Sequence, residues 1–293
     1  MKPYPFTYFS PDSLNAALEL KNKYGNDALC LAGGQSLVAS LNYHCLEPAV
    51  LIDLNNLAEL EGIRREANGE IRIGAMTRQR ILEFDPIIEK YLPLMHASVP
   101  YIAHTAIRNR GTIGGSLSYA DPAAELPAVT MTLNARFKAA SAHGERWIPA
   151  GDFFIDMFTN ALKPEEILVE IAIPAAAQGS TWGYSELSRR HGDRVMMGVS
   201  AVLELDASAT CRSARLALLN AARTPVNAKL SAHMLVGEKL TPAIIEAAAN
   251  QASKETNPTG DVHTSVAYTR HLAGELTART LQQAQNRAVT KNN

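Results

Sequence analysis

Cysteine is scarce in this chain, and the few thiols lie far apart. Of 293 residues only Cys30, Cys45 and Cys211 are cysteines, and no two form a C-x-x-C pair. Three thiols this dispersed cannot supply the four ligands of an ordinary iron–sulfur cluster. We therefore expect them to behave as small hydrophobic side chains. The eight histidines show no H-E-x-x-H or similar spacing, so no metal site is predicted in this chain.

An excess of charge of one sign is also lacking. The chain has 28 Lys and Arg against 29 Asp and Glu, a formal net charge of −1. This balance gives no electrostatic reason to expect nucleic acid or a membrane surface as partner. No apolar run approaches the ~20 residues that span a bilayer, and the N-terminal residues lack the apolar stretch of a secretory signal. We expect a cytoplasmic protein without a membrane span.

Two diglycine turns are the most informative features that are present. The first is Gly33-Gly34, within residues 31–37, and the second is Gly114-Gly115, within residues 108–117. Paired glycines let a backbone approach a ligand closely, and successive N–H groups in such a turn can form an anion site. An expected strand at 28–31 precedes the first turn and an expected helix at 36–42 follows it, an order typical of phosphate binding. Together the turns predict a clamp on both phosphates of a dinucleotide.

The remaining pattern predicts an α+β protein of two domains. In the first part we expect strands at residues 49–54, 62–64, 71–74 and 167–173. The helices expected there are one that Ser10 begins and Gly25 ends, a short one capped by Thr77, a long one at 94–107 and one at 125–133. Residues 175–180 are small and polar and predict the domain boundary. Beyond it we expect strands at 182–187, 199–205 and 211–219, then helices near 225–236, 242–253 and 263–288.

Several motifs, in this order, give the chain a family resemblance: residues 32–37, 53–54, 73–77, 107–115, 120–127 and 166–168. Over nearly its whole length the sequence resembles the FAD-binding (medium) subunits of the molybdenum hydroxylase, or xanthine dehydrogenase, family. That family includes the carbon monoxide dehydrogenase flavoprotein and the medium subunits of dehydrogenases for nicotine, quinoline or caffeine. The resemblance implies a PCMH-type FAD-binding domain, like that of vanillyl-alcohol oxidase, at residues 1–177, with two α/β subdomains at 1–57 and 58–177. It implies a C-terminal α+β domain of the carbon monoxide dehydrogenase flavoprotein type at residues 178–293.

The same resemblance implies which residues bind FAD, without a covalent link. The first turn would wrap the pyrophosphate on one side and the second on the other, with Ile102 near the adenine or ribose. Glu125 matches an acidic cofactor contact, and Leu168 matches an apolar contact near the flavin. No catalytic residue and no metal ligand is assigned to this chain. The implied cofactor-binding residues are Cys30, Leu31, Ala32, Gly33, Gly34, Gln35, Ser36, Leu37, Ile102, Gly111, Thr112, Ile113, Gly114, Gly115, Ser116, Glu125, Leu168, Glu186 and Arg194.

At two positions the chain departs from the family pattern. Ser185 and Glu186 stand where family members often carry a lysine, shortly after the position of Tyr184. Arg194 follows Gly192 and Asp193, where an aromatic residue can cover one flavin face. A cation near the flavin N1 region stabilises reduced, anionic flavin, so we hypothesise that Arg194 replaces the missing lysine charge.

Through the resemblance we expect this chain to be the electron-transfer component of an oxidoreductase complex. A large partner subunit would hold a molybdopterin cofactor and hydroxylate the substrate, an N-heteroaromatic compound. A small partner subunit would carry two two-iron iron–sulfur clusters, from which FAD here takes electrons and passes them to an external acceptor. The expected assembly is a dimer of heterotrimers.

Other interpretations stay open at this stage. The chain could be a stand-alone FAD-dependent oxidase, the medium subunit of an aerobic carbon monoxide dehydrogenase, or a non-catalytic nucleotide-binding module. Arg108 and Arg110 could contact the phosphates, but we favour solvated loop charges or ion pairs for them, because the glycine-turn amides can already satisfy the phosphates. Glu125 can be a first-turn acid that the helix dipole stabilises. His104 and His191 can be plain surface residues rather than proton relays.

Overall fold

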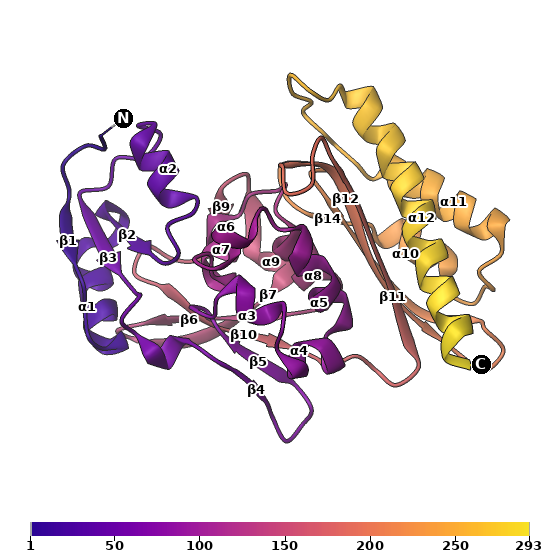
Figure 1. The fold of residues 1–293 in the computed structure, drawn as a ribbon, viewed down its shortest axis with the longest axis horizontal. Helices are drawn as coiled ribbons and strands as arrows, with labels where there is room; N and C mark the ends of the chain where they lie inside the picture. The colour runs from indigo at the N-terminus through magenta and orange to yellow at the C-terminus, as the bar shows by residue number, and fades with distance from the viewer. Residues whose placement is uncertain (1, 293) are drawn as a thin grey trace.

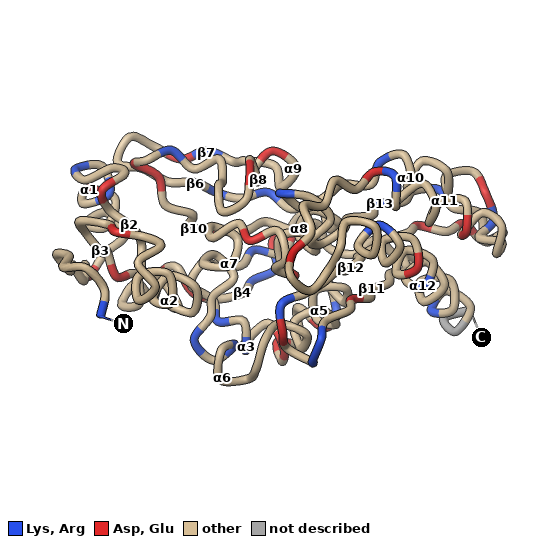
Figure 2. Tube along the Cα trace, turned by 90° about the horizontal axis from the view of Figure 1, so that it is seen from above, with Lys and Arg blue, Asp and Glu red and all other residues tan. Residues whose placement is uncertain are grey.

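Three main β-sheets succeed one another along the chain, and helices pack on each of them (Figure 1). The computed structural model describes residues 2–292, with side chains described as far as residue 289. The three-stranded N-terminal sheet lies at one end, the four-stranded C-terminal sheet at the other, and a five-stranded sheet between them (Figure 1). Basic and acidic residues are interspersed over all three parts (Figure 2), in keeping with the net charge of −1.

The N-terminal sheet is parallel and has the order β1-β3-β2; its strands are β1 (Thr7–Phe9), β2 (Ala28–Leu31) and β3 (Val50–Asp53). Helix α1 (Leu14–Tyr24) packs on it, because Ala17 and Leu18 share an apolar core with Ile52. Ser13, and not Ser10, caps α1 by accepting a hydrogen bond from the Ala16 N–H. Since β2 and β3 are parallel, their carboxyl ends meet at one edge. There β2 passes into the first diglycine turn and α2 (Leu37–Asn42).

The middle sheet is antiparallel throughout and has the order β4-β5-β10-β6-β7. Its strands are β4 (Ile63–Arg65), β5 (Ile71–Gly74), β6 (Arg136–Ser141), β7 (Gly144–Pro149) and β10 (Ile167–Ile173). Apolar residues of one face, such as Ile73, Phe137 and Ile171, form the largest core with the helices that connect β5 to β6. Those helices are α3 (Gln79–Leu82), α4 (Pro86–Tyr91), α5 (Pro93–Ser98), α6 (Thr105–Arg108), α7 (Ile113–Tyr119) and α8 (Glu125–Thr132). Between β7 and β10 the chain forms α9 (Ala150–Phe153) and a small hairpin, β8 (Phe154–Asp156) and β9 (Thr159–Asn160).

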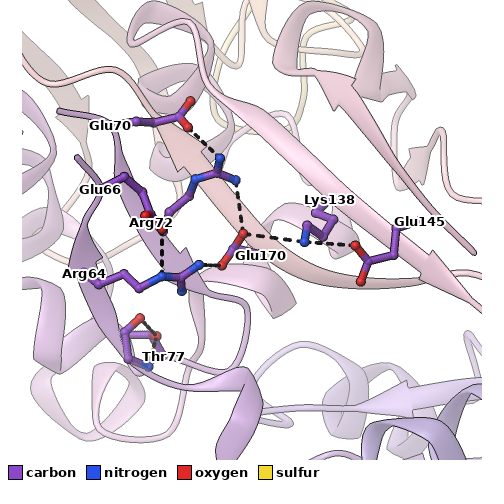
Figure 3. A network of polar contacts seen from close by, with 9 residues as sticks. Arg64, Glu66, Glu70, Arg72, Thr77, Lys138, Glu145 and Glu170 are labelled. Atoms are coloured by element: carbon purple, nitrogen blue, oxygen red, sulfur yellow. Dashed lines mark hydrogen bonds and ion pairs between the residues drawn. The ribbon is translucent and has the colours of Figure 1, made fainter. Parts of the chain in front are cut away.

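The opposite face of the middle sheet is covered by charged side chains, as strand alternation requires. Glu170 of β10 lies at the centre of this network (Figure 3). It accepts hydrogen bonds from Arg64 of β4 at 2.5 Å and from Arg72 of β5 at 3.2 Å. Lys138 of β6 lies 4.0 Å from the same carboxylate and 3.0 Å from Glu145 of β7. These pairs connect all five strands across the sheet and need no ligand to explain them.

The C-terminal sheet is an antiparallel array of β11 (Ser180–Ser188), β12 (Val195–Leu205), β13 (Cys211–Leu219) and β14 (Val226–Asn227). One face is covered by α10 (Lys229–Leu235), α11 (Pro242–Lys254) and α12 (Val266–Asn292) (Figure 1). The other face meets the middle part of the molecule, where the Thr132 and Ser200 hydroxyls are 2.6 Å apart and Arg215 donates to the Thr132 carbonyl at 2.9 Å. Among residues 2–292, no helix is both long and apolar enough to cross a membrane.

Most of the predicted elements, and the α+β class, are confirmed, but one long helix and the helix caps at Ser10 and Thr77 are wrong. The expected helix at 94–107 is three short pieces: α5, a 3₁₀ turn at Val99–Tyr101, and α6. Ala103 has a φ of 41°, and the Arg108 guanidinium donates to the carbonyls of Ile102 and Ala103, so the chain turns inward before α6. Thr77 does not cap α3 either, because its hydroxyl is hydrogen-bonded to the backbone of Gly62.

Candidate functional site

The two diglycine turns, whose glycine pairs are 81 residues apart in sequence, pack directly against each other. A Cβ built on Gly33 would overlap the carbonyl oxygen of Arg110 and lie 2.8 Å from the Gly111 Cα. A Cβ on Gly115 would lie 3.5 Å from the Cβ of Ala32. Glycine is therefore required at position 33 for this close approach of two backbones. The fold therefore brings the two turns together.

The first turn carries a row of unused backbone donors. Within the described part of the chain, none of the five N–H groups of residues 33–37 donates to a protein acceptor. Gly34 has a φ of 74°, and the carbonyls of Gly34 and Ser36 accept from residues 38 and 40 as α2 begins. Consecutive free amides at the end of a parallel strand suit a phosphate, which accepts several hydrogen bonds at once. This turn thus fits one side of a dinucleotide pyrophosphate.

The second turn differs from the first, because its amides are already engaged. The N–H groups of residues 113–116 donate to Thr77, Ala75 and Thr112 at 2.8–3.2 Å. The turn therefore has no row of free amides to offer; in the described chain the Thr112 N–H and the Ser116 hydroxyl are among its unused donors. A Cβ on Gly114 would lie 2.6 Å from the Cβ of Ala75, so this glycine serves packing on β5. The second turn therefore positions the first turn and does not offer a second row of free amides.

Arg78, which no sequence motif singles out, bridges the two turns. Arg78 donates from Nη1 to the Arg110 carbonyl at 2.6 Å and from Nη2 to the Asn55 Oδ1 at 2.8 Å. Asn55 in turn donates from Nδ2 to the Ala32 carbonyl at 2.9 Å. Arg78 and Asn55 thus hold a carbonyl of each turn in place. The signal for Asn55 is its position two residues after β3, at the edge where the strand ends meet.

Glu125 lies near the junction of the middle part with the C-terminal sheet. It is the first residue of α8 and is only 7% exposed. Apart from its own backbone N–H, no described residue donates a hydrogen bond to its carboxylate. Burial, and next the charge of Glu186, raise the pKa of Glu125 to about 8. The helix start favours the anion by about 0.5 kcal/mol, less than one pKa unit, and does not offset this shift.

Glu186 reaches this junction from β11. Two residues before it on the same face of the strand, Tyr184 donates its hydroxyl to the Glu186 carboxylate at 2.5 Å. Burial raises the pKa of Glu186 to about 7, although the Tyr184 hydrogen bond works in the opposite direction. The ring of Tyr101, from the 3₁₀ turn, lies 5.2 Å from that of Tyr184. The junction thus contains two carboxyls that have no ion-pair partner, and the charge of Glu186 acts on Glu125. An aromatic pair, Tyr101 and Tyr184, lies beside them.

The other predicted residues have varied surroundings. Ile102 and Leu168 are 8% and 4% exposed and belong to the large core. Burial raises the pKa of the Cys30 thiol to about 11, so this cysteine is an unreactive apolar neighbour of the first turn. Arg194 is exposed and lies 3.6 Å from Asp121. Its guanidinium charge is therefore partly compensated.

Arg108 is a member of an ion pair rather than a solvated charge. Its Nε lies 3.0 Å from a Glu83 oxygen, and the side chain is 7% exposed. With its bonds to the carbonyls of Ile102 and Ala103, it fixes the loop that carries Tyr101. Arg110, by contrast, is exposed. His104 and His191 are exposed as well, the latter edge-on to Tyr101 at 5.9 Å.

Comparison with known proteins agrees with this geometry. Residues 4–176 match the FAD binding domain in molybdopterin dehydrogenase, and residues 182–284 match the CO dehydrogenase flavoprotein C-terminal domain. The chain belongs to the FAD-binding medium subunits of the molybdenum hydroxylase family. It is 38% identical to the 6-hydroxypseudooxynicotine dehydrogenase complex subunit alpha of Paenarthrobacter nicotinovorans, over 98% of this chain and 97% of that one.

Two solved structures of this family have the same fold. One is carbon monoxide dehydrogenase from Hydrogenophaga pseudoflava lacking the Mo-pyranopterin moiety of the molybdenum cofactor, with a TM-score of 0.95, 36% identity, and coverage of 98% of this chain and 99% of that one. The other is quinoline 2-oxidoreductase from Pseudomonas putida 86, with a TM-score of 0.93, 33% identity, and coverage of 98% and 99%. The family prediction is confirmed, and with it an FAD-binding oxidoreductase subunit.

Proposed function

We propose that this chain carries non-covalent FAD as the electron-transfer subunit of a molybdenum hydroxylase. The observation that carries the proposal is the row of five unused amides at residues 33–37, closed on one side by the second turn. When bound, FAD accepts and releases electrons, while the chain binds and orients it. The three isolated cysteines cannot hold an iron–sulfur cluster, so the clusters that feed FAD would belong to a partner.

Within this proposal, the chain's own residues divide the work along the cofactor. The 33–37 amides would bind the pyrophosphate, and Ser116 and the Thr112 N–H would complete that site. Arg78 and Asn55 would hold both turns in position. Glu125, buried and without a protein partner, would bind a polar atom of the cofactor toward the domain junction, where Glu186 and Arg194 would set the charge. We further propose a division into residues 1–57, 58–177 and 178–293, with FAD between the first two.

We propose as partners a large molybdenum-cofactor subunit and a small iron–sulfur subunit, assembled as a dimer of heterotrimers. An N-heteroaromatic compound is the proposed substrate, because the proteins similar to this chain include enzymes named for 6-hydroxypseudooxynicotine and quinoline as well as the carbon monoxide enzyme. A carbon monoxide dehydrogenase is the second candidate, because the carbon monoxide enzyme's chain is 36% identical to this one, a value similar to that of the other relatives. In either case the substrate would not touch this chain.

Copurification from the native host tests the assembly. Tagged chain should bring down one chain rich in cysteine and one that contains molybdenum, with flavin in the eluate. The isolated chain, reconstituted with FAD, should not oxidise small alcohols or amines by itself. A colourless chain that takes up no FAD would overturn the proposal, and oxidation of an alcohol by the isolated chain would favour a stand-alone oxidase.

A further inference from the structure

The buried carboxyl of Glu125 at the domain junction is unusual because no described side chain donates a hydrogen bond to it or forms an ion pair with it. Arg108, the cation whose charge favours its ionised form, is engaged by Glu83 and by backbone carbonyls. The other neighbouring cation, Arg194, is 53% exposed and lies beside Asp121. Glu125 therefore lies among negative groups while it is 7% exposed. A buried charge without a partner is costly, and a carboxyl in this position holds a proton instead.

The neighbouring Glu186 determines which of the two carboxyls is protonated. Tyr184 donates its hydroxyl to Glu186 at 2.5 Å, and a hydrogen bond to the anion stabilises the ionised form. Glu125 receives no such bond from another described residue. The charge of Glu186 disfavours ionisation of Glu125, so the proton of the pair resides on Glu125. The pKa values agree with this order, at about 8 for Glu125 and about 7 for Glu186.

We propose that Glu125 binds the cofactor as a neutral acid, donating its carboxyl proton to an acceptor atom of FAD, with Glu186 as the anion that keeps it protonated. This inference rests on the proposed function. It reverses the ordinary expectation for an acid at a nucleotide site, which is a carboxylate that accepts hydrogen bonds from ribose hydroxyls. The titratable and charged groups that act on Glu125 from the elements packed around it are Arg108, Asp121, Tyr184 and Glu186. Behind them, Tyr101 packs on Tyr184 and Arg194 lies beside Asp121.

The pH dependence of FAD affinity tests this inference on the full chain. If only the protonated form of Glu125 binds, affinity is complete below its pKa of about 8 and is lost as pH rises through it. The dissociation constant, followed by flavin fluorescence, should increase about tenfold from about pH 7 to about pH 9. Glu125→Gln keeps a neutral donor of the same shape, so it should bind FAD within about threefold of wild type and show no such loss.

Two further variants separate the role of Glu186 from general effects. Glu186→Gln removes the anion, so the pKa of Glu125 should fall and the loss of affinity should begin at lower pH. Glu89→Gln makes the same chemical change on the exposed face of α4 and should leave the profile of wild type unchanged. Infrared difference spectra of the wild-type chain with and without FAD should show a protonated carboxylic-acid band that shifts on binding and is missing in Glu125→Gln.

The results that would overturn the inference are distinct from those that would overturn the proposed function. A chain that binds no FAD at any pH contradicts both. Tight FAD binding that does not weaken between neutral and alkaline pH contradicts this inference alone. So does a large loss of affinity in Glu125→Gln at every pH, or the absence of a carboxylic-acid band, since either would mean that Glu125 acts as a carboxylate.

Discussion

The Cα of Gly33 faces the carbonyl of Arg110 so closely that no side chain fits between the two backbones. This contact joins the end of β2 to the turn that precedes α7, two segments that lie far apart in the sequence. It also explains why the first turn can leave its amides unused. Backbone packing against Arg110, together with Arg78, holds the first turn in position. Hydrogen bonds of the turn's own amides are not needed for this.

Gly33→Ala should separate the two turns. The added Cβ would overlap the Arg110 carbonyl and lie 2.8 Å from the Gly111 Cα, and neither backbone can move without disturbing the other turn. Overpacking of this kind costs about 1–3 kcal/mol of folding stability. We expect a lower urea midpoint and a loss of FAD affinity of at least about tenfold, or ~1.4 kcal/mol. Gly151→Ala is the matched control, because a Cβ there meets nothing within 4 Å; equal FAD affinity in both variants would contradict the prediction.

Arg78 and Asn55 should be energetically coupled. Each holds a carbonyl of one turn, and they hydrogen-bond to each other at 2.8 Å. A double-mutant cycle of Arg78→Ala and Asn55→Ala, with FAD affinity as the measurement, tests this coupling. We expect an interaction energy of about 0.5–3 kcal/mol, the range for residues in direct contact. Arg78→Lys should not restore affinity, because an ammonium cannot reach two acceptors with the geometry of a guanidinium. Strictly additive effects would show that the bridge does not position the turns.

Much of the fold follows from local sequence, whereas the detail of the site depends on long-range packing. Strands such as β2, β5 and β10 are short apolar runs with clear ends, and the sequence predicts them well. Strands β6 and β7 escape detection because their outward faces carry Arg136, Lys138 and Arg146, which make the runs look polar. Both diglycine turns are visible in the sequence, but which of them has free amides depends on Ala75 and Thr77, remote residues whose carbonyls accept from the second turn.

The burial of Arg108 could not be read from sequence either, and it leads to a prediction about stability. Replacing this arginine by glutamine leaves Glu83 half-paired and frees the carbonyls of the loop at residues 102–103. Breaking a buried pair in this way costs about 3 kcal/mol, which urea unfolding at neutral pH should detect.

The effect of Arg108→Gln should also depend on pH. Burial acts to raise the pKa of Glu83, but the hydrogen bonds from Arg108 and Arg80 outweigh it, so the folded-state pKa lies below the ordinary value of 4.5. The pair therefore contributes stability above that ordinary value, and the contribution is lost as pH falls through the folded-state pKa. The difference in unfolding free energy between wild type and Arg108→Gln should accordingly become smaller in acid, where only the bonds of Arg108 to the loop carbonyls still contribute. A constant difference at all pH values would mean that Glu83 is not the relevant partner.

Arg194 offers a test of how the chain sets the flavin potential. If its guanidinium lies close enough to stabilise reduced, anionic flavin, Arg194→Ala should lower the midpoint potential of bound FAD, while Arg194→Lys should keep it near wild type. The carboxylate of Asp121, 3.6 Å away, compensates part of this charge, so Asp121→Asn should raise the potential. Arg212, exposed and paired with Asp206 at 2.7 Å on the β12–β13 loop, provides the control, and Arg212→Ala should change nothing. An unchanged potential in Arg194→Ala would show that the cation does not replace the lysine of the family pattern.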